Sequence, residues 1–337
     1  MALAGLSMGS GAWTLKAIRQ FRFEHWLFVG MLVGVGLLPW TVTVAFCPHA
    51  FEALSSVPAS ALVKANLFAL GWGIANVLCT VCFVRIGVAL TGGILGGLGL
   101  SLGVTVPMLF KASGLFAKAP DLTSAAGLLV LAGVAVMLAA VVLISAAGFG
   151  RDRALQQSLP TSGHFATGLI MVVIAGILST GPNFAFAYSQ GPIVSAMRQR
   201  GASEVASTFA VWAVGMLGGV LVNLAYPAYL MSRNRTWHVL IWARRELIFP
   251  ALMGVQFCAA IALLGNGNLV LGALGASVGW GIYQALQILG NQAVGFLSGE
   301  WAGVPAKPRW QMYSGIALLV LAAVIMAYGN SRVVRPS

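Results

Sequence analysis

Long apolar stretches alternate with short polar gaps along the whole chain. Most stretches contain about 18 residues or more, the length that an α-helix needs to cross a bilayer. The pattern therefore predicts an all-α polytopic membrane protein, and its gaps leave no room for a soluble domain. Ten spans are expected, at residues 1–17, 26–47, 61–84, 86–110, 123–148, 164–188, 203–231, 246–265, 268–297 and 311–329.

The two halves of the chain resemble one another. The sequence VGMLVGV from Val29 returns as VGMLGGV from Val214, and LSMG from Leu6 returns as LSTG from Leu178. Both pairs fall in corresponding spans of their halves, which indicates a duplication. Because five is an odd number of spans, the second half would insert upside down relative to the first. Inverted repeats of this kind are the architecture of many secondary transporters, with the substrate site near the midplane.

The duplication divides the chain into three parts. We expect a first five-helix repeat at residues 1–150, a connecting loop at 151–163 and a second five-helix repeat at 164–337. The first helix is shorter than its counterpart by about two to three turns, because few residues precede Leu6. This comparison predicts that the natural chain begins about ten residues upstream of Met1.

Composition supports a membrane location. The chain is 59% hydrophobic and 8% charged, with a net charge of +12. A charged fraction this low is untypical of soluble domains. The 19 Lys and Arg residues lie mainly between the spans, where they act as topology signals beside lipid headgroups rather than as a nucleic-acid site. Twelve of them follow odd-numbered spans, which predicts a cytoplasmic first connection and both termini outside.

Polar side chains keep to one face of several spans. In the ninth span, Trp280, Gln284, Gln287 and Asn291 step by four, three and four residues, which places them on one helical face. Amides both donate and accept hydrogen bonds, as hydroxyl groups require, and an indole covers the apolar face of a sugar ring. We therefore expect a wall for a neutral polar substrate, formed by Asn76, Asn183, Asn223, Gln256, Trp280, Gln284, Gln287 and Asn291.

The same residue types also join membrane helices, so a structural role is the alternative for every one of them. For Asn66, Thr80 and Gln292 the structural role is the simpler interpretation. The middle of the spans contains no carboxylate to hold a cationic drug and no Lys or Arg to hold a phosphorylated sugar.

The seven carboxylates lie at helix ends or in connections. Glu24, beside His25 at the entrance to the second span, is the candidate carrier of a coupling proton. Its alternative role is a carboxylate that the dipole of a helix N-terminus stabilises. Cys79 and Cys82 form a CxxC motif inside a span, with no His or second CxxC nearby, and are interpreted as packing residues. No metal or other cofactor is expected.

Several short motifs occur in a characteristic order: FEHWLFVG, LLPW, GWGIAN, VRIG, GILSTG, GGVLVNLAY, VQF and GEW. In this order and spacing the chain resembles the L-rhamnose–proton symporter family of the drug/metabolite transporter superfamily, over about nine-tenths of its length. The resemblance implies the drug/metabolite transporter fold, with ten helices in two inverted five-helix repeats. It also implies the import of a deoxysugar with protons across a bacterial inner membrane.

The resemblance can be carried over only at positions that match. These are Lys16, Glu24, Pro39, Trp40, Trp72, Gly73, Asn76, Arg85, Gly87, Gly176, Ser179, Gly181, Asn223, Gln256, Trp280, Glu300 and Trp301. Gln284, Gln287 and Asn291 depart from the aromatic, Met and Gly residues expected in the family on this helix. The likeness therefore implies the fold and the class of transport, and leaves open a neutral solute other than L-rhamnose.

These observations predict a secondary active transporter, not an enzyme. Its substrate would be a small neutral polar solute, a sugar such as L-rhamnose or a related deoxysugar, moved by proton symport with alternating access. We expect a monomer whose partners are the solute, the coupling proton and membrane lipid, without nucleic acid. A metabolite or drug exporter of the same superfamily is the first alternative. A membrane enzyme or lipid-handling protein would need a catalytic cluster, and a sensor would need an output domain.

Overall fold

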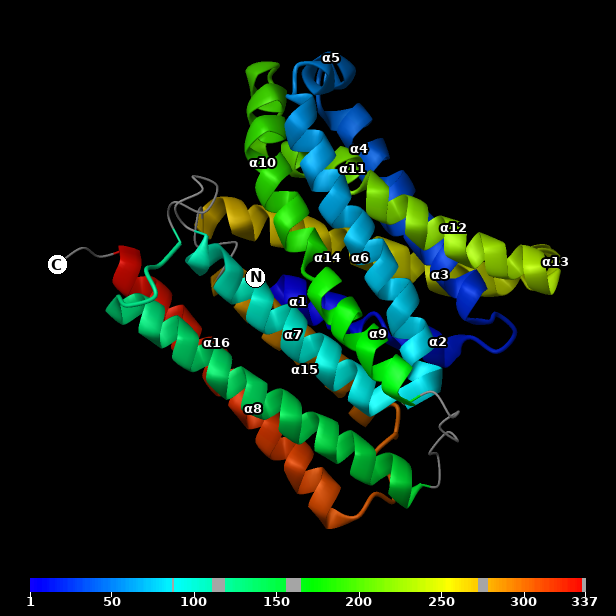
Figure 1. Cartoon of the computed structure of the whole chain (residues 1–337). Helices are drawn as coiled ribbons and strands as arrows, with labels where there is room; N and C mark the ends of the chain where they lie inside the picture. The colour runs from blue at the N-terminus through cyan, green and yellow to red at the C-terminus, as the bar shows by residue number, and fades with distance from the viewer. Residues whose placement is uncertain (87, 111–118, 156–164, 272–277, 335–337) are drawn as a thin grey trace. The chain divides into compact units, whose positions relative to one another are not determined.

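The structure, a computed structural model of the chain, describes residues 1–86, 88–110, 119–155, 165–271 and 278–334 (Figure 1). Within these ranges the regular elements are all helices, as predicted, and no strand occurs. Gly87 of the VRIG motif and most of the predicted connecting loop lie outside them. The helix before that loop, α8, continues to Ala154, so the first residues expected in the loop are helical.

The elements follow one another in the order α1 (Ala2–Ser10), α2 (Trp13–Ala17), α3 (Phe23–Met31), the π-helix η1 (Leu32–Leu37), α4 (Leu38–Phe46), α5 (Ala50–Ser55), α6 (Ala59–Ile86), α7 (Val88–Leu109), α8 (Ala125–Ala154), α9 (Phe165–Leu178), α10 (Gly181–Gln199), α11 (Glu204–Gly215), α12 (Leu217–Asn234), α13 (His238–Trp242), the 3-10 helix η3 (Arg244–Leu247), α14 (Ile248–Leu271), α15 (Trp280–Leu297) and α16 (Ala306–Val334).

Seven helical runs in the described residues are long and apolar enough to cross a membrane. They are Phe23–Phe46, Ala59–Phe83, Leu90–Leu109, Ala125–Ala154, Ala166–Gln199, Arg244–Leu271 and Ala306–Gly329. The bent pair α11 and α12 gives an eighth if it is one span. These eight correspond to eight of the ten predicted spans and establish a polytopic helical membrane protein.

The other two predicted spans differ from this set. Residues 1–17 form two short helices, α1 and α2, rather than one. The ninth predicted span contains α15, whose 18 residues include four amides that make it more polar than the seven runs. The count of ten spans therefore stays a prediction.

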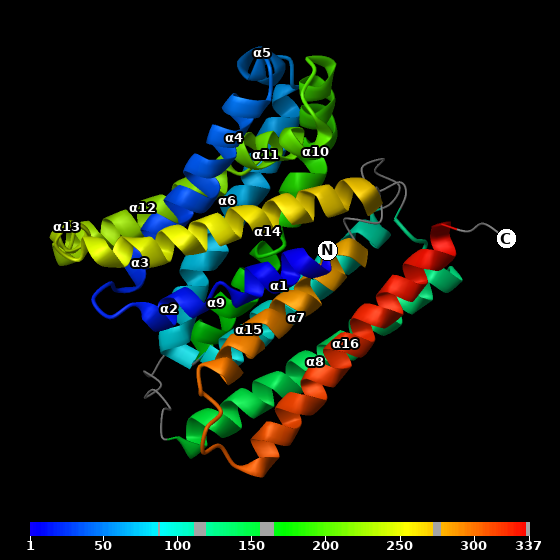
Figure 2. The same ribbon diagram turned by 180° about the vertical axis from the view of Figure 1, so that it is seen from behind.

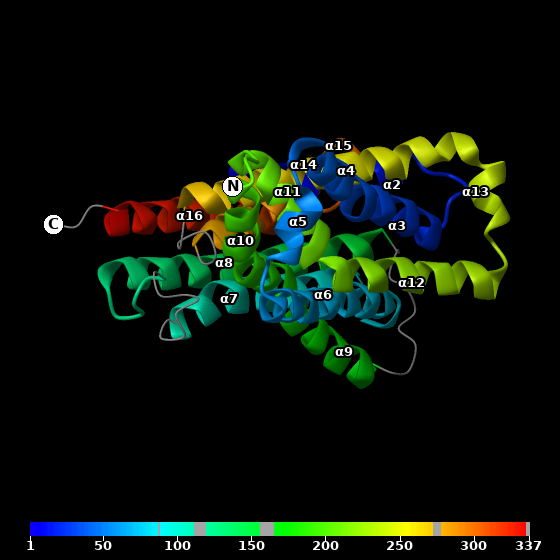
Figure 3. The same cartoon turned by 90° about the horizontal axis from the view of Figure 1, so that it is seen from above.

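The chain forms two compact units. The first unit contains residues 1–9, 75–180 and 267–337, and the second contains residues 10–74 and 181–266. Each unit takes residues from both predicted repeats. In the first unit, α8 and α16 lie side by side along their lengths (Figures 1 and 2), and α7 contacts both α8 and α9. In the second unit, Figure 3 shows the turn through α13 that returns the chain from α12 to α14.

The pair α11 and α12, which covers the seventh predicted span, is bent by 55° at Met216 in the second unit. One side chain on α6 hydrogen-bonds to backbone groups at this break. Asn66 Nδ2 donates to the carbonyl oxygen of Val214 at 2.9 Å, and Asn66 Oδ1 accepts from the N–H of Gly218 at 2.8 Å. A helix break inside a membrane leaves backbone groups without partners. These hydrogen bonds fit the interpretation of Asn66 as a residue that joins helices.

We predict that Asn66→Leu lowers the melting temperature of the purified protein in detergent by several degrees. The substitution leaves the Val214 carbonyl and the Gly218 N–H unpaired, at a cost of about 1–3 kcal/mol for each buried group. Thr80→Val is the matched control on the same helix, because the Thr80 hydroxyl bonds only to the Asn76 carbonyl of its own helix. Equal melting temperatures for the wild type and Asn66→Leu would contradict this role.

Candidate functional site

Trp280 begins α15 and is buried in the first unit, with 6% of its surface exposed. Its ring centre lies 5.3 Å from that of Tyr283, and its indole edge lies against Gly103 of α7, where any side chain would collide with it. The indole Nε1–H has no hydrogen-bond partner among the described residues. A buried donor without an acceptor is costly, which makes this N–H a candidate contact for a ligand oxygen.

The amides that follow Trp280 on α15 are less buried than Trp280 itself. Gln284 and Gln287 are half-buried, and Asn291 is exposed. Helix α1 borders this face, because Gly5 and Gly9 lie against the α15 backbone near Tyr283 and Gln287. Two small residues four positions apart allow two membrane helices to approach this closely. The stripe predicted from spacing therefore lies beside the contact between α1 and α15. Asn76, also in the first unit, is half-buried on α6.

The second unit contains the other three predicted wall residues. Asn183 on α10 and Asn223 on α12 are buried, with 3% and 1% of their surfaces exposed. Asn223 Nδ2 donates to the carbonyl of Gly219 one turn earlier, at 2.9 Å. Their burial fits either a polar interior or contacts between helices.

Gln256 on α14 is bonded at both ends of its amide. Its Oε1 accepts from the indole Nε1 of Trp13 at 3.0 Å, and its Nε2 donates to the hydroxyl of Ser10 at 2.7 Å. Gln256 therefore joins α14 to the segment around α2 in this structure. A contact with substrate would require it to exchange these partners.

Trp212 is a residue that the predicted wall omits. It lies on α11 in the second unit, is 4% exposed, and its Nε1–H has no partner among the described residues. Its ring packs 5.4 Å from that of Phe186. The sequence places Trp212 on the same helical face as Met216 and Asn223, and this spacing was the signal that could have included it.

Glu24 differs from the other carboxylates of the chain. All seven lie in the described residues, and Glu24 alone among them is buried, with 6% of its surface exposed. It lies in the first turn of α3, and its Oε1 atom has no hydrogen-bond partner there. A carboxylate at this position is favoured by the helix dipole, yet the dipole alone does not satisfy the buried oxygen.

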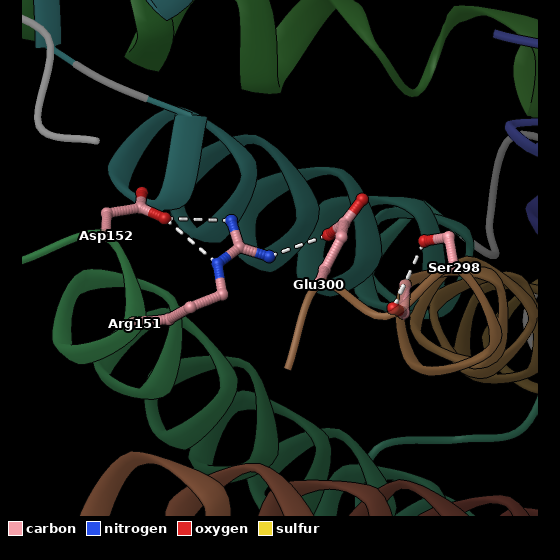
Figure 4. A network of polar contacts seen from close by, with 5 residues as sticks. Arg151, Asp152, Ser298 and Glu300 are labelled. Atoms are coloured by element: carbon pink, nitrogen blue, oxygen red, sulfur yellow. Dashed lines mark hydrogen bonds and ion pairs between the residues drawn. The ribbon is translucent and has the colours of Figure 1, made fainter. Parts of the chain in front are cut away.

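Asp152, Glu300 and Glu246 are carboxylates with structural partners. Arg151 at the end of α8 bonds Asp152 Oδ1 and Glu300 Oε2, each at 2.8 Å (Figure 4). Its guanidinium carbon also lies 5.6 Å from the ring centre of Trp301. Glu246 accepts the main-chain N–H groups of residues 19–21 at 3.0–3.2 Å, which attaches the turn before α3 to η3. These carboxylates hold connections in place.

His25 follows Glu24 and is fully buried. Its Nδ1 accepts the main-chain N–H of Arg22 at 3.1 Å, and its Nε2 lies 3.1 Å from the carbonyl oxygen of Thr236. Only the neutral tautomer with a proton on Nε2 satisfies both bonds, since Nδ1 must accept and Nε2 must donate. His25 therefore positions α3 against the turn after α12. Both of its ring nitrogens are hydrogen-bonded, whereas the neighbouring Glu24 retains an unbonded carboxyl oxygen.

Helices long and apolar enough to cross a membrane define an integral membrane protein. Buried ionisable groups at such spans are typical of the transporter class. Comparison with known proteins identifies its family. The sequence profile of "L-rhamnose-proton symport protein (RhaT)" matches residues 4–332. Proteins named L-rhamnose-proton symporter from Yersinia pestis (strain Pestoides F) and Yersinia pseudotuberculosis serotype O:1b (strain IP 31758) are each 25% identical over 325 residues. Each alignment covers 93% of this chain and 92% of the relative.

The chain belongs to the L-rhamnose-proton symport family. The resemblance inferred from the motifs is thereby confirmed. The relatives are named as symporters, so the chain is a transporter rather than an enzyme. No solved structure matches the chain.

We predict that Gln256→Leu loosens the segment around α2. The substitution removes the bonds to Ser10 and Trp13, and each is worth about 0.5–1.5 kcal/mol. Amide hydrogen exchange at residues 10–17 should therefore accelerate about tenfold. Asn266→Leu on the same helix is the control, because Asn266 Nδ2 bonds only to the Ala262 carbonyl of α14. Unchanged exchange at residues 10–17 in Gln256→Leu would show that these bonds do not hold the segment.

Proposed function

We propose that the chain moves a small neutral polar solute, a sugar such as L-rhamnose or a related deoxysugar, across the bacterial inner membrane together with a proton. Alternating access would expose the solute and the proton to one side at a time, in a monomer. The family and the names of the relatives support a proton-coupled sugar transporter, and they do not favour the exporter. The observation that carries the proposal is the buried carboxyl of Glu24, whose Oε1 atom has no hydrogen-bond partner among the described residues.

Glu24 has the properties that a coupling residue needs. An ionisable group at the edge of a membrane span can bind a proton and release it on the other side when its surroundings change. Protonation removes a charge that is costly to move through the membrane. His25 supports this role as a positioning residue, because its ring nitrogens already bond to Arg22 and Thr236.

The proposed substrate wall consists of neutral side chains. Its amides can donate to and accept from hydroxyl groups, and the Trp280 ring can cover an apolar sugar face while its unpaired N–H donates to a hydroxyl oxygen. The same chemistry makes Trp212 a further candidate. The residues proposed for the wall are Asn76, Asn183, Asn223, Gln256, Trp280, Gln284, Gln287 and Asn291.

The proposed fold has ten spans in two inverted repeats, residues 1–150 and 164–337, related as in the drug/metabolite transporter fold. One recurring contact in the first unit supports this arrangement. Gly5 of α1, in the first span, lies against α15 in the ninth, and Gly176 of α9, in the sixth, lies against Leu98 of α7 in the fourth. In a duplication with five spans in each half, the first span corresponds to the sixth and the fourth to the ninth. The two contacts are therefore equivalent under the proposed repeat.

The role of Glu24 is tested in proteoliposomes with a radiolabelled sugar. We predict that Glu24→Gln abolishes accumulation driven by a pH gradient and retains counterflow exchange, because the neutral amide mimics the protonated carboxyl. His25→Gln is the matched variant at the next position. It should lower the melting temperature and retain pH-driven accumulation. Accumulation by Glu24→Gln at the wild-type level would assign the proton to another group, and uptake that requires Na⁺ at constant pH would remove the proton from the proposal.

The substrate wall is tested at Gln287, after a thermal-shift screen of sugars and nucleosides has identified a ligand. We predict that Gln287→Leu weakens binding about tenfold, because a lost hydrogen bond and an unpaired ligand hydroxyl together cost about 1–3 kcal/mol. Gln292→Leu, off the stripe by about one residue, is the control and should bind normally. Unchanged affinity with a lower melting temperature in Gln287→Leu would make the stripe a contact between helices.

A further inference from the structure

An apolar groove of about 750 Å³ opens between α7, α8 and α9, entirely within the first unit. Gly93, Gly97 and Ser101 follow one another at four-residue spacing along the α7 side, so no large side chain fills it there. Val142 and Phe149 of α8 form part of the opposite wall and are 66% and 45% exposed. The proposed sugar wall includes none of the residues that line this groove.

The chemistry of the groove suits hydrocarbon rather than a sugar. Its two hydroxyl groups already donate within their own helices, Ser101 Oγ to the Gly97 carbonyl at 2.6 Å and Ser145 Oγ to the Val141 carbonyl at 2.8 Å. The remaining lining residues carry no polar side chain. A polyol would lose its water here without gaining donors in return.

The length of the groove corresponds to one leaflet. Along α7 it extends from Leu90 to Ser101, about 16 Å at the rise of an α-helix. This is roughly half of the ~30 Å hydrocarbon core of a bilayer. Gly93 lies opposite Ser145 and Gly97 opposite Val141, so Leu90 and Phe149 lie at the same end. A membrane-spanning partner helix would match a groove as long as the whole hydrocarbon core. One acyl chain extends through one leaflet, which matches the length of this groove.

Positive charge lies at the Leu90 and Phe149 end of the groove. Arg153 is exposed one helical turn beyond Phe149 on the same face of α8. Arg85 lies in the last turn of α6, shortly before α7, and its Nη1 contacts only the weak acceptor Met171 Sδ, at 3.6 Å. Neither arginine has a carboxylate partner in the part of the chain that the structure describes. Arg151 nearby is neutralised by Asp152 and Glu300 (Figure 4).

We propose that this groove binds one acyl chain of an anionic phospholipid, with the headgroup phosphate at Arg153 and Arg85. The apolar walls, the depth of one leaflet and the unpaired cations at the mouth each match one part of such a lipid. The positive-inside pattern of the sequence places this end at the cytoplasmic leaflet. The site does not depend on the transported solute.

The proposal is tested by native mass spectrometry of the purified full chain, titrated with phosphatidylglycerol or phosphatidylcholine of identical acyl chains. The wild type should retain phosphatidylglycerol in preference to phosphatidylcholine. Arg153→Ala should reduce phosphatidylglycerol binding about fivefold, the effect expected of one arginine beside an anionic headgroup. Arg309→Ala removes an exposed cation from α16, outside the groove, and should bind as the wild type does. Added glycerol phosphate, which has no acyl chain, should not compete.

A second pair of variants tests the acyl chain. Ala146→Phe fills the groove and should reduce binding of both lipids, whereas Leu128→Phe, exposed on α8 outside the groove, should not. Equal retention of the two lipids by the wild type, or equal losses in Arg153→Ala and Arg309→Ala, would overturn the proposal. So would a dimer that binds no lipid and that Ala146→Phe dissociates, since this would assign the groove to a second copy of the chain.

Discussion

Hydrocarbon cannot hydrogen-bond, so each polar group inside the membrane must find its partner within the protein. The chain satisfies most of its buried groups locally. Thr43, Ser101, Ser145 and Ser189 each donate to the carbonyl four residues earlier in their own helix. Six buried side-chain atoms in the described residues have no partner, and three of these belong to Glu24, Trp212 and Trp280. Against a background of local satisfaction, these three exceptions are the groups that the proposed function assigns to a proton or a solute.

The sequence predicted the helical class and most of the spans, because a continuous apolar run of sufficient length is itself the physical requirement for crossing a membrane. It did not predict the break at Met216, since apolar residues continue through it. Hydrogen bonds from Asn66, some 150 residues earlier in the chain, bridge the break. It also did not predict that residues 1–17 divide into two short helices.

In the candidate site too, features set by one helix could be predicted from the sequence, whereas contacts between distant parts of the chain could not. Helical spacing aligns Trp280 with Gln284, Gln287 and Asn291 on one face of α15, because periodicity is a property of the helix alone. Spacing does not give the burial of that face, which falls from buried Trp280 to exposed Asn291. Spacing could not reveal that Gln256 bonds to Ser10 and Trp13, because those partners come from another part of the chain. Nor could composition separate Glu24 from His25. In the folded chain, one carboxyl oxygen of Glu24 has no partner, whereas His25 makes two structural hydrogen bonds.

The attachment of residues 19–21 to Glu246 has an evolutionary consequence. The carboxylate binds main-chain N–H groups, which nearly every amino acid supplies. Substitutions at Arg19, Gln20 and Phe21 can therefore accumulate among relatives without loss of this attachment, provided that proline does not remove a donor. Glu246 has no such freedom, because it alone supplies the negative charge. Sequence variation in the turn would then coexist with a constant position of its backbone.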